Sequence, residues 1–342
     1  ISTFENNGQS SINSFDTTAQ STINEWRGAI NTITMNDGVP ALAISDASGL
    51  NQQELNDLDV IVPTIAHLRA IPANRESSIA SVTVLGYYSA GDGGGGHPRV
   101  WKAGPFIDNG GSVIVANSGG AWVFADEAPV HVKAFGAKGV AGEDDTEAFA
   151  NALASGIPVF SDESCYHEIQ RIVISSVIDE PYFNYKKVSS TLSVNFDGGG
   201  CTIKGKSMIG ESYPYPKDGT GLAGDAWCWI FDFSHIKGVK LHNFNMTGAL
   251  FDNIEEDTKP YIYGVQGTRM ALNTMLSGVI CYSVISVDID KISIEKVAKG
   301  LRVYRTDLPS VKNVIISKVN DAFQFVDTTN GTYENLHSFH AK

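Results

Sequence analysis

Two stretches of the sequence contain residues that could do chemistry: a run of glycines and a cysteine close to a histidine. The four glycines at 93–96 could cradle a phosphate, but neither Gly-Lys-Ser/Thr nor a helical segment follows them. We therefore interpret the run as a wide turn between two strands, where glycine adopts positive φ without strain. Cys165 and His167 could act as nucleophile and base on one strand face. No third residue that would orient the histidine is evident, so packing is the simpler interpretation.

Two pairs of side chains could form an acid pair or a metal site. Asp144 and Asp145 are adjacent carboxylates, but Glu147, three residues after Asp144, completes a capping-box pattern, so we expect these residues to begin a helix. His337 and His340 could chelate a metal ion, but no third ligand lies nearby in the sequence. The sequence therefore predicts no metal and no other cofactor.

The composition favours a mainly β protein and argues against two classes of partner. The 342 residues include 34 glycines and many short runs of valine and isoleucine. Lys and Arg number 25 against 38 Asp and Glu, and the net charge of −13 repels a nucleic acid backbone. No apolar run approaches the roughly 20 residues needed to span a bilayer, so we expect no membrane partner. The 4 cysteines are far apart in the sequence, and we expect reduced, buried thiols.

Residues 1–75 are expected to form an N-terminal helical region, with a second helical piece at 64–71. Apolar side chains recur at steps of three and four and make a narrow stripe, which is typical of a coiled-coil seam and predicts self-association. A helix packed against the next domain of its own chain is the alternative, because only about three heptads are available. The stripe consists of Ile12, Phe15, Ala19, Ile23, Trp26, Ile30 and Ile33.

Residues 76–128 are expected to form a small β domain. Short strands begin near Ser81, Arg99, Gly111 and Ala121, and turns rich in glycine, asparagine and aspartate separate them. Short strands bounded by such turns are typical of hairpins.

Residues 129–342 are expected to form a parallel β-helix with a capping helix near 144–155. The segment that starts at Asp290 aligns with the segment that starts at Lys312, and the same offset leads from Ile292 to Val314 and on to Leu336. Strand-like segments at such a fixed period are typical of a solenoid. The pattern is still running at the last residues of the sequence, so we expect the native protein to continue beyond them.

Equivalent positions of successive coils should stack in columns about 4.8 Å apart. Asn313 and Asn335 fall in one such column, which Lys291 interrupts. Residues 207–275 break the period and are interpreted as one irregular insertion.

Five motifs in a fixed order resemble the tailspike proteins of tailed bacteriophages, which belong to the pectate-lyase-like superfamily of right-handed β-helices. They are VTVLGYYSAGDGGGGHPRVW, DNGGSVI, GGAWVF, VKAFGAKGVAGEDDTEAF and VNFDGGGCTIKG. The usual Gly-Asp-Gly after FGAK reads Gly139, Val140 and Ala141 here. The resemblance implies a homotrimer in the virion, assembled in the host cytoplasm and attached to phage tail or baseplate proteins by its N-terminal region. It also implies that the β-helix recognises and depolymerises a bacterial surface polysaccharide, either capsule or O-antigen.

Depolymerisation by hydrolysis needs two carboxylates about 5 to 10 Å apart that flank the glycosidic bond. A β-helix can supply them, because residues two apart on a strand share a face. On a substrate with uronic acids a lyase reaction is the alternative, with Arg302 or Arg305 holding the sugar carboxylate. Each carboxylate could instead belong to a solvated face. The candidate catalytic residues are Asp288, Asp290, Glu295 and Asp321.

Aromatic side chains gather in the segment 207–275 and could bind sugar rings by stacking. Trp227, Tyr261 and Tyr263 are the candidates for substrate binding. Packing of the insertion against the β-helix is the alternative interpretation.

Two other functions remain open. The chain could be only the structural anchor or assembly module of a tailspike, with receptor binding and catalysis in a C-terminal part. A free, pectinase-like bacterial enzyme is a third possibility, which the N-terminal seam and the polar first residues disfavour.

Overall fold

The computed structural model describes seven stretches of the chain. Within the N-terminal helical region, residues 19–24 form a helix, while the rest of the predicted seam lies outside the described residues. Trp227, Tyr261, Tyr263 and His340 also lie outside them. None of the helices in these stretches is long and apolar enough to cross a membrane. The stretches are 19–24, 59–177, 184–206, 228–248, 276–297, 299–319 and 321–339.

A five-stranded sheet has the order β1-β2-β3-β5-β4. Antiparallel pairs join β3 and β4 to β5, and Trp122 on β5 is fully buried. The short helix α4 (Ile65–Arg69), with Thr64 as its N-cap, agrees with the predicted second helical piece. Because β1 belongs to the sheet, the sheet starts earlier than residue 76, where we expected the small domain to begin. The strands are β1 (Asp59–Val62), β2 (Ser81–Val84), β3 (Arg99–Lys102), β4 (Val113–Val115) and β5 (Ala121–Phe124).

The glycine run lies in the loop between β2 and β3 and serves two physical purposes. Gly93 and Gly96 have φ of 82° and 71°, as the turn interpretation predicts. Gly95 has another reason to be small, because a Cβ there would lie 2.1 Å from the carbonyl oxygen of Val84. The run therefore allows close packing as well as backbone freedom.

Two charged side chains hold this glycine loop. The Asp92 carboxylate accepts four hydrogen bonds of 2.7–3.0 Å from backbone N–H groups within residues 87–94. Burial by itself raises the pKa of Asp92, but these hydrogen bonds outweigh it and hold the pKa below its ordinary value of 3.8. Arg99 is fully buried and donates to the carbonyl oxygens of Gly95 (2.8 Å) and Gly111 (3.1 Å). Burial lowers the pKa of Arg99 to about 10.

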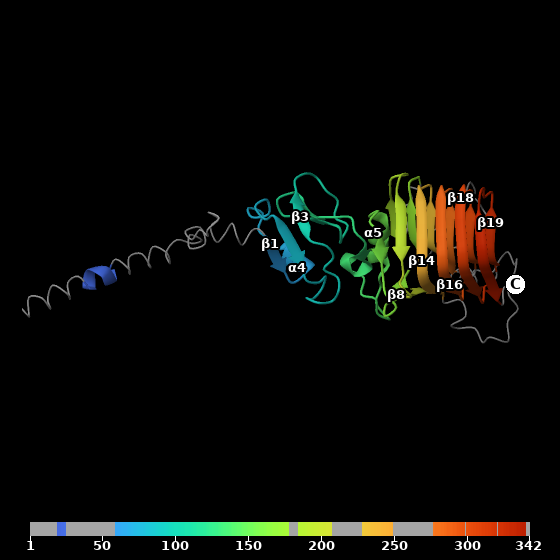
Figure 1. The fold of residues 1–342 in the computed structure, drawn as a ribbon, viewed down its shortest axis with the longest axis horizontal. Coiled ribbons are helices and arrows are strands. Elements are labelled where there is room, and N and C mark those ends of the chain that lie inside the picture. The colour runs from blue at the N-terminus through green and yellow to red at the C-terminus, as the bar shows by residue number, and fades with distance from the viewer. Residues whose placement is uncertain are drawn as a thin grey trace, which may run out of the picture. The chain divides into compact units, whose positions relative to one another are not determined.

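Two long parallel sheets form the β-helix (Figure 1). One has the order β10-β9-β13-β15-β17-β19, and the other has the order β20-β18-β16-β14-β11-β7-β6, with β12 pairing to β14 and β8. Strand pairing is parallel from coil to coil, which confirms the predicted parallel β-helix. The strands are β6 (Val130–His131), β7 (Val159–Phe160), β8 (Tyr166–Ile169), β9 (Ile172–Ser175), β10 (Asn184–Lys187), β11 (Ser193–Asp197), β12 (Thr202–Gly205), β13 (Cys228–Ser234), β14 (Gly238–Thr247), β15 (Leu276–Tyr282), β16 (Ser286–Glu295), β17 (Lys299–Tyr304), β18 (Leu308–Ser317), β19 (Asp321–Val326) and β20 (Thr332–Phe339).

The register of these strands confirms the predicted period. Ile292 pairs with Val314, and Val314 pairs with Leu336. The interpretation of 207–275 as one irregular insertion is wrong in its extent, because β13 and β14 lie within it and pair in register with β15 and β16. Asn245 and Ser293 share a column although they are 48 residues apart. The regular coil thus resumes inside the segment that appeared irregular.

Successive coils turn at a corner where non-glycine residues adopt positive φ. At the corner within β14, β16, β18 and β20, Asn243, Lys291, Asn313 and Asn335 have φ of 51° to 56°. Asparagine tolerates this conformation better than most residues. The Asn335 amide donates to Asn313 Oδ1 at 2.9 Å, and the Asn313 amide donates to Asp290 Oδ1 at 2.7 Å. The predicted asparagine column is therefore confirmed, together with its interruption at Lys291.

Helix α5 (Thr146–Ala154) lies at the start of the stacked strands and packs into the core of the first coils (Figure 1). Phe149 is fully buried, and its ring contacts that of Phe196 at 5.5 Å between centroids. The predicted capping box is wrong: the N-cap is Asp145, whose side chain makes no capping hydrogen bond. Asp144 instead accepts from the backbone N–H of Thr146 at 3.0 Å.

Candidate functional site

Three of the four predicted catalytic carboxylates lie on β16, where each has a structural partner. Asp288 Oδ2 lies 3.2 Å from Nε2 of His242 on the neighbouring strand β14. Asp290 accepts from Asn313 at 2.7 Å, and Glu295 accepts from the hydroxyl of Thr247 at 3.5 Å. These contacts join neighbouring coils, so the carboxylates help to fix the register of the strands.

Asp321 is the fourth predicted catalytic residue and lies apart from the other three. It begins β19, which belongs to the other long sheet. The structure therefore brings Asp288 and Asp290 onto one strand, two residues apart, and leaves Asp321 on a different sheet. The catalytic role of all four residues stays a prediction.

The two predicted substrate-binding arginines gather around a pair of stacked tyrosines. Tyr282 on β15 pairs in register with Tyr304 on β17, so their rings stack at 5.3 Å between centroids with an interplanar angle of 10°. The Cζ atom of Arg302 lies 5.7 Å from the Tyr304 ring, and Arg305 Cζ lies 5.4 Å from the same ring. We call these four residues the arginine–tyrosine cluster.

Arg305 is the most exposed charge of the arginine–tyrosine cluster. Its backbone turns away from β17 at a φ of 51°, and its side chain is 56% exposed. One guanidinium nitrogen donates to the hydroxyl of Tyr282 at 3.0 Å, and Nε lies 3.8 Å from a carboxylate oxygen of Asp327. A guanidinium carries five N–H donors, so these contacts leave donors of the exposed side chain for a carboxylate.

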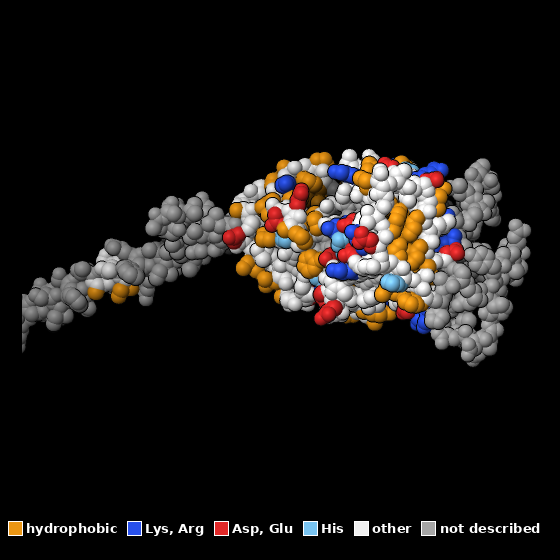
Figure 2. All heavy atoms as spheres, turned by 45° about the vertical axis from the view of Figure 1, so that its right-hand side comes forward, with side chains coloured by type: hydrophobic (Ala, Val, Ile, Leu, Met, Phe, Trp, Pro, Cys, Tyr) orange, Lys and Arg blue, Asp and Glu red, His pale blue; other side chains and the backbone are white. Residues whose placement is uncertain are grey.

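Sequence reasoning identified the two arginines and missed the two tyrosines. Tyr282 and Tyr304 are separated by one coil period, the same spacing that joins Arg305 to Asp327. Applying the period to exposed residues as well as to core residues would have found the cluster. Elsewhere, charged side chains of both signs are interspersed among the described residues of the face in Figure 2, so that face carries no broad cationic patch.

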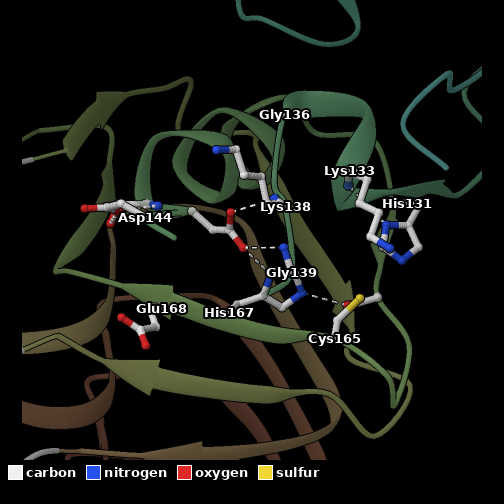
Figure 3. Close-up of polar contacts among 12 residues, drawn as sticks. His131, Lys133, Gly136, Lys138, Gly139, Asp144, Cys165, His167 and Glu168 are labelled. Carbon is white, nitrogen blue, oxygen red and sulfur yellow. Dashed lines mark hydrogen bonds and ion pairs between the residues drawn. The ribbon is translucent and has the colours of Figure 1, made fainter. Parts of the chain in front are cut away.

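A buried hydrogen-bond network joins two residues that sequence reasoning had considered separately. His167 Nδ1 lies 2.6 Å from Asp145 Oδ2, and His167 Nε2 lies 2.9 Å from the hydroxyl of Ser161 (Figure 3). The order Asp–His–Ser resembles a hydrolytic triad. All three residues are 4% exposed or less, so a substrate has no access to the serine.

The Asp145 carboxylate uses the rest of its hydrogen-bonding capacity on a loop. It accepts from the backbone N–H groups of Lys138 at 2.7 Å and Gly139 at 2.9 Å. The network therefore fixes the FGAK loop against β8, and we assign it a structural role. The packing interpretation of His167 is in keeping with this arrangement.

His131, Asp162 and Cys165 bring three potential metal ligands within 4.8 Å of one another, next to this network (Figure 3). His131 Nδ1 accepts from the backbone N–H of Lys133 at 3.1 Å as the N-cap of the 3-10 helix η1 (Val132–Phe135), so its ring proton lies on Nε2. That proton points at Asp162, 3.0 Å away. A metal ion needs the lone pair of Nε2 and a donor at Nδ1, so the arrangement does not fit a metal ligand. The residues form a hydrogen-bonded cap instead.

Three of the four cysteines are shown to be buried and unpaired, as predicted. Burial raises the pKa of Cys201 to about 12, and it raises the pKa of Cys281 as well. Few thiolates form at neutral pH under these conditions, so neither thiol acts as a nucleophile. Buried free thiols are found at Cys165, Cys201 and Cys281.

Part of the chain matches a known family. Residues 61–126 match the family model of the phage tail protein small four-stranded β-sheet domain. This match and the parallel β-helix that follows it confirm the resemblance to phage tailspikes. No curated protein sequence matches the chain.

Several solved structures are similar to the chain at low identity. WceF of Pantoea stewartii, a glycan biofilm modifying enzyme with a tailspike-like parallel β-helix fold, has 11% identity and a TM-score of 0.39 over 82% of this chain and 48% of its own. The tailspike of Acinetobacter baumannii phage AM24 has 14% identity and a TM-score of 0.36. The match covers 87% of this chain and 60% of the tailspike. Tailspike gp49 of Acinetobacter baumannii phage Fri1, a capsular polysaccharide depolymerase, has 15% identity and a TM-score of 0.35. The match covers 83% of this chain and 50% of gp49. The chain thus spans about half the length of these proteins.

Proposed function

We propose that the chain is part of a phage tailspike that recognises a host surface polysaccharide through its β-helix. In this proposal the protein is a homotrimer and attaches to tail or baseplate proteins by its N-terminal region. The match to a phage tail domain supports the location in the virion. The observation that carries polysaccharide recognition is the arginine–tyrosine cluster on the β-helix, with Arg305 56% exposed.

The chemistry of the cluster fits an acidic sugar. Each tyrosine turns one face toward the other ring, Arg305 lies over both rings, and the His235 ring lies 5.3 Å from Tyr282, so we expect a sugar to contact the ring edges and hydroxyls. Arg305 supplies charge-assisted hydrogen bonds to a carboxylate. Arg302 and Arg305 keep the role of binding the sugar carboxylate that the sequence predicts for them.

Binding to purified capsular polysaccharides and O-antigens from many strains tests this proposal. We expect the chain to bind at least one of them, and Arg305→Ala to weaken that binding by about tenfold or more, because it removes a charged hydrogen bond. Arg69→Ala is the matched control, since Arg69 is a 42% exposed, ion-paired arginine of the small β domain. Equal binding by wild type and Arg305→Ala would contradict the assignment of the cluster.

The proposal includes cleavage, with Asp288, Asp290, Glu295 and Asp321 as the candidate catalytic residues. Purified chain spotted on bacterial lawns should give translucent halos, and mass spectrometry of the fragments separates hydrolysis, which adds water, from β-elimination, which does not. Single Asn or Gln variants that keep binding and lose the halo would identify the catalytic pair. If all four single variants keep the halo, the catalytic assignment is wrong.

The second candidate function is that of a tail-anchoring module without catalysis. The match of residues 61–126 to a phage tail domain favours it, because that match concerns the small β domain and not the β-helix. A chain that binds no polysaccharide, gives no halo and co-assembles with tail proteins would support this alternative. Oligomeric mass from light scattering tests the trimer that both candidates require.

A further inference from the structure

A polar groove lies at the asparagine corner of the β-helix. It has a volume of about 450 Å³, which falls in the range of small-ligand sites. Phe244, one of its lining residues, is buried, and the other lining residues are glycines or polar residues. The groove is lined by Gly199, Gly200, Asn243, Phe244, Asn245 and Lys291.

The amides at the rim are held in fixed orientations. Asn243 donates to the carboxylate of Asp197 at 3.0 Å, and Asn245 accepts from the hydroxyl of Ser293 at 2.7 Å. The Asn245 amide also donates to the carbonyl oxygen of Gly200 at 3.3 Å. Pre-oriented amides with unused donors and acceptors suit the hydroxyl groups of a sugar.

Two glycines form one wall of the groove, so this wall carries no side chains. Gly199 and Gly200 have φ of 56° and 95°, which disfavours any side chain there. A Cβ at Gly199 would also lie 2.5 Å from the carbonyl oxygen of Ser161. The wall therefore consists of backbone, and a ligand can approach it closely.

Lys291 is the unexpected residue of this groove. It has a φ of 56° at a corner where the equivalent positions of the other coils are Asn243, Asn313 and Asn335. A lysine in this conformation is less favourable than asparagine, and it cannot continue the amide ladder.

The charge of Lys291 has no assigned use within the fold. Its side chain is exposed, and among the residues that the structure describes it forms no ion pair. The positive charge of Lys291 at the rim of the groove attracts the anionic group of a ligand at short range.

We propose that Lys291 binds the carboxylate of an acidic sugar residue in this groove, while the amides of Asn243 and Asn245 bind its hydroxyl groups. The inference rests on the proposed recognition of a surface polysaccharide and adds a second contact region, distinct from the arginine–tyrosine cluster. The ligand class is a polysaccharide that contains uronic acids or other carboxylate sugars. Lysine at this corner then lowers the free energy of unfolding but strengthens ligand binding.

The test measures binding of the whole chain to a panel of capsular polysaccharides, each in its native form and in a carboxyl-reduced form. We expect carboxyl reduction to abolish binding of the native ligand. Lys291→Asn should weaken binding by about tenfold, whereas Lys291→Arg should stay within about threefold of wild type. Lys291→Asn should also raise the melting temperature, because it completes the amide ladder, so weaker binding cannot be due to unfolding.

Lys296→Asn is the matched control, because Lys296 also has a φ of 56° but lies at a different corner and does not line the groove. It should bind within about twofold of wild type. If wild type binds and Arg305→Ala does not, while Lys291→Asn binds as wild type does, this inference is overturned and the proposed function stands. If wild type binds no polysaccharide of the panel, the proposed function is overturned and the inference with it. Binding that survives carboxyl reduction overturns the inference as well.

Discussion

Asp92 illustrates how one carboxylate organises a loop that has little apolar surface of its own. Four backbone N–H groups point at it, and they stabilise its ionised form more than burial destabilises it. The pKa in the folded protein is therefore below that in the unfolded chain. The stability linked to this group is complete above the unfolded pKa and is lost as the pH falls through the folded pKa.

The first prediction concerns Asp92→Asn. The amide accepts fewer hydrogen bonds than the carboxylate, so the free energy of unfolding should fall by about 2 kcal/mol at neutral pH. The difference from wild type should narrow below about pH 4, where the wild-type carboxylate begins to protonate. Urea unfolding of wild type and Asp92→Asn at several pH values measures this difference in the free energy of unfolding. Asp126→Asn, a 55% exposed carboxylate of the same domain, is the control, and a difference that stays constant with pH would contradict the explanation.

The second prediction concerns the buried network at Asp145. Asp145→Ala leaves the N–H groups of Lys138 and Gly139 and the ring of His167 without their acceptor, and should lower the free energy of unfolding by about 4 kcal/mol. Asp144→Ala removes a 43% exposed carboxylate and should cost about 1 kcal/mol. Thermal unfolding of both variants measures the difference. Similar losses for the two variants would show that the network contributes little.

Some of these contacts between residues could be predicted from the sequence. Asp145 and His167 are 22 residues apart, one coil period, so the orienting residue that His167 seemed to lack was one coil upstream. Ser161 could not be found in this way, because it reaches His167 from the β7 side of the same coil, six residues away. The capping box was wrong because the N-cap residue is Asp145, and its carboxylate binds the Lys138 and Gly139 backbone and His167 instead of the helix end.

At the scale of elements, the corner column links sequence to stability. Asn335 donates an amide hydrogen bond to Asn313 across one coil, and Lys291 interrupts the column. Positive φ costs a lysine more than an asparagine, and the missing hydrogen bond adds to that cost.

The third prediction follows from this column. Lys291→Asn should raise the free energy of unfolding by about 1 kcal/mol, since it relieves the backbone strain and extends the ladder. Asn313→Ala should lower it by about 1 kcal/mol or more, because it loses both hydrogen bonds and the favoured residue for that φ. Urea denaturation of the two variants measures these effects. A destabilised Lys291→Asn variant would contradict the ladder explanation.

The period of the last coils was predictable because columns of inward-facing side chains must match from coil to coil. Ile292, Val314 and Leu336 show the match. The earlier coils were hidden, because the column that contains Asn245 and Ser293 advances by 48 residues there. Aligning the sequence with itself at the period of the last coils cannot detect a coil of another length. Strand β14 of that coil nevertheless keeps the alternation of buried and more exposed residues.

At the scale of the molecule, stability depends on neighbouring coils. Each coil of a solenoid buries its core residues against the coils above and below it. Phe231 on β13 is fully buried between neighbouring strands, whereas Phe325 on β19 is only half-buried. A mainly β chain with a parallel β-helix was predictable from composition and periodicity, while the contact of each coil with its neighbours needed the structure.

The fourth prediction uses this gradient. Phe231→Ala should lower the free energy of unfolding by about 4 kcal/mol, because it opens a cavity in a closed part of the core. Phe325→Ala should lower it by about 1 to 2 kcal/mol, because that ring keeps contact with water. Hydrogen exchange should show the matching order, with slower exchange in β13 than in β19. Equal losses from the two variants would contradict the gradient.

The coil that advances by 48 residues has a further consequence for how such a protein can change over generations. Its strands keep their register with the next coil, so the added length is tolerated without cost to the ladder. A lineage can therefore gain, lose or exchange sequence at that point while the scaffold stays the same. A change of length at that point leaves the pairing of β14 with β16 as it is.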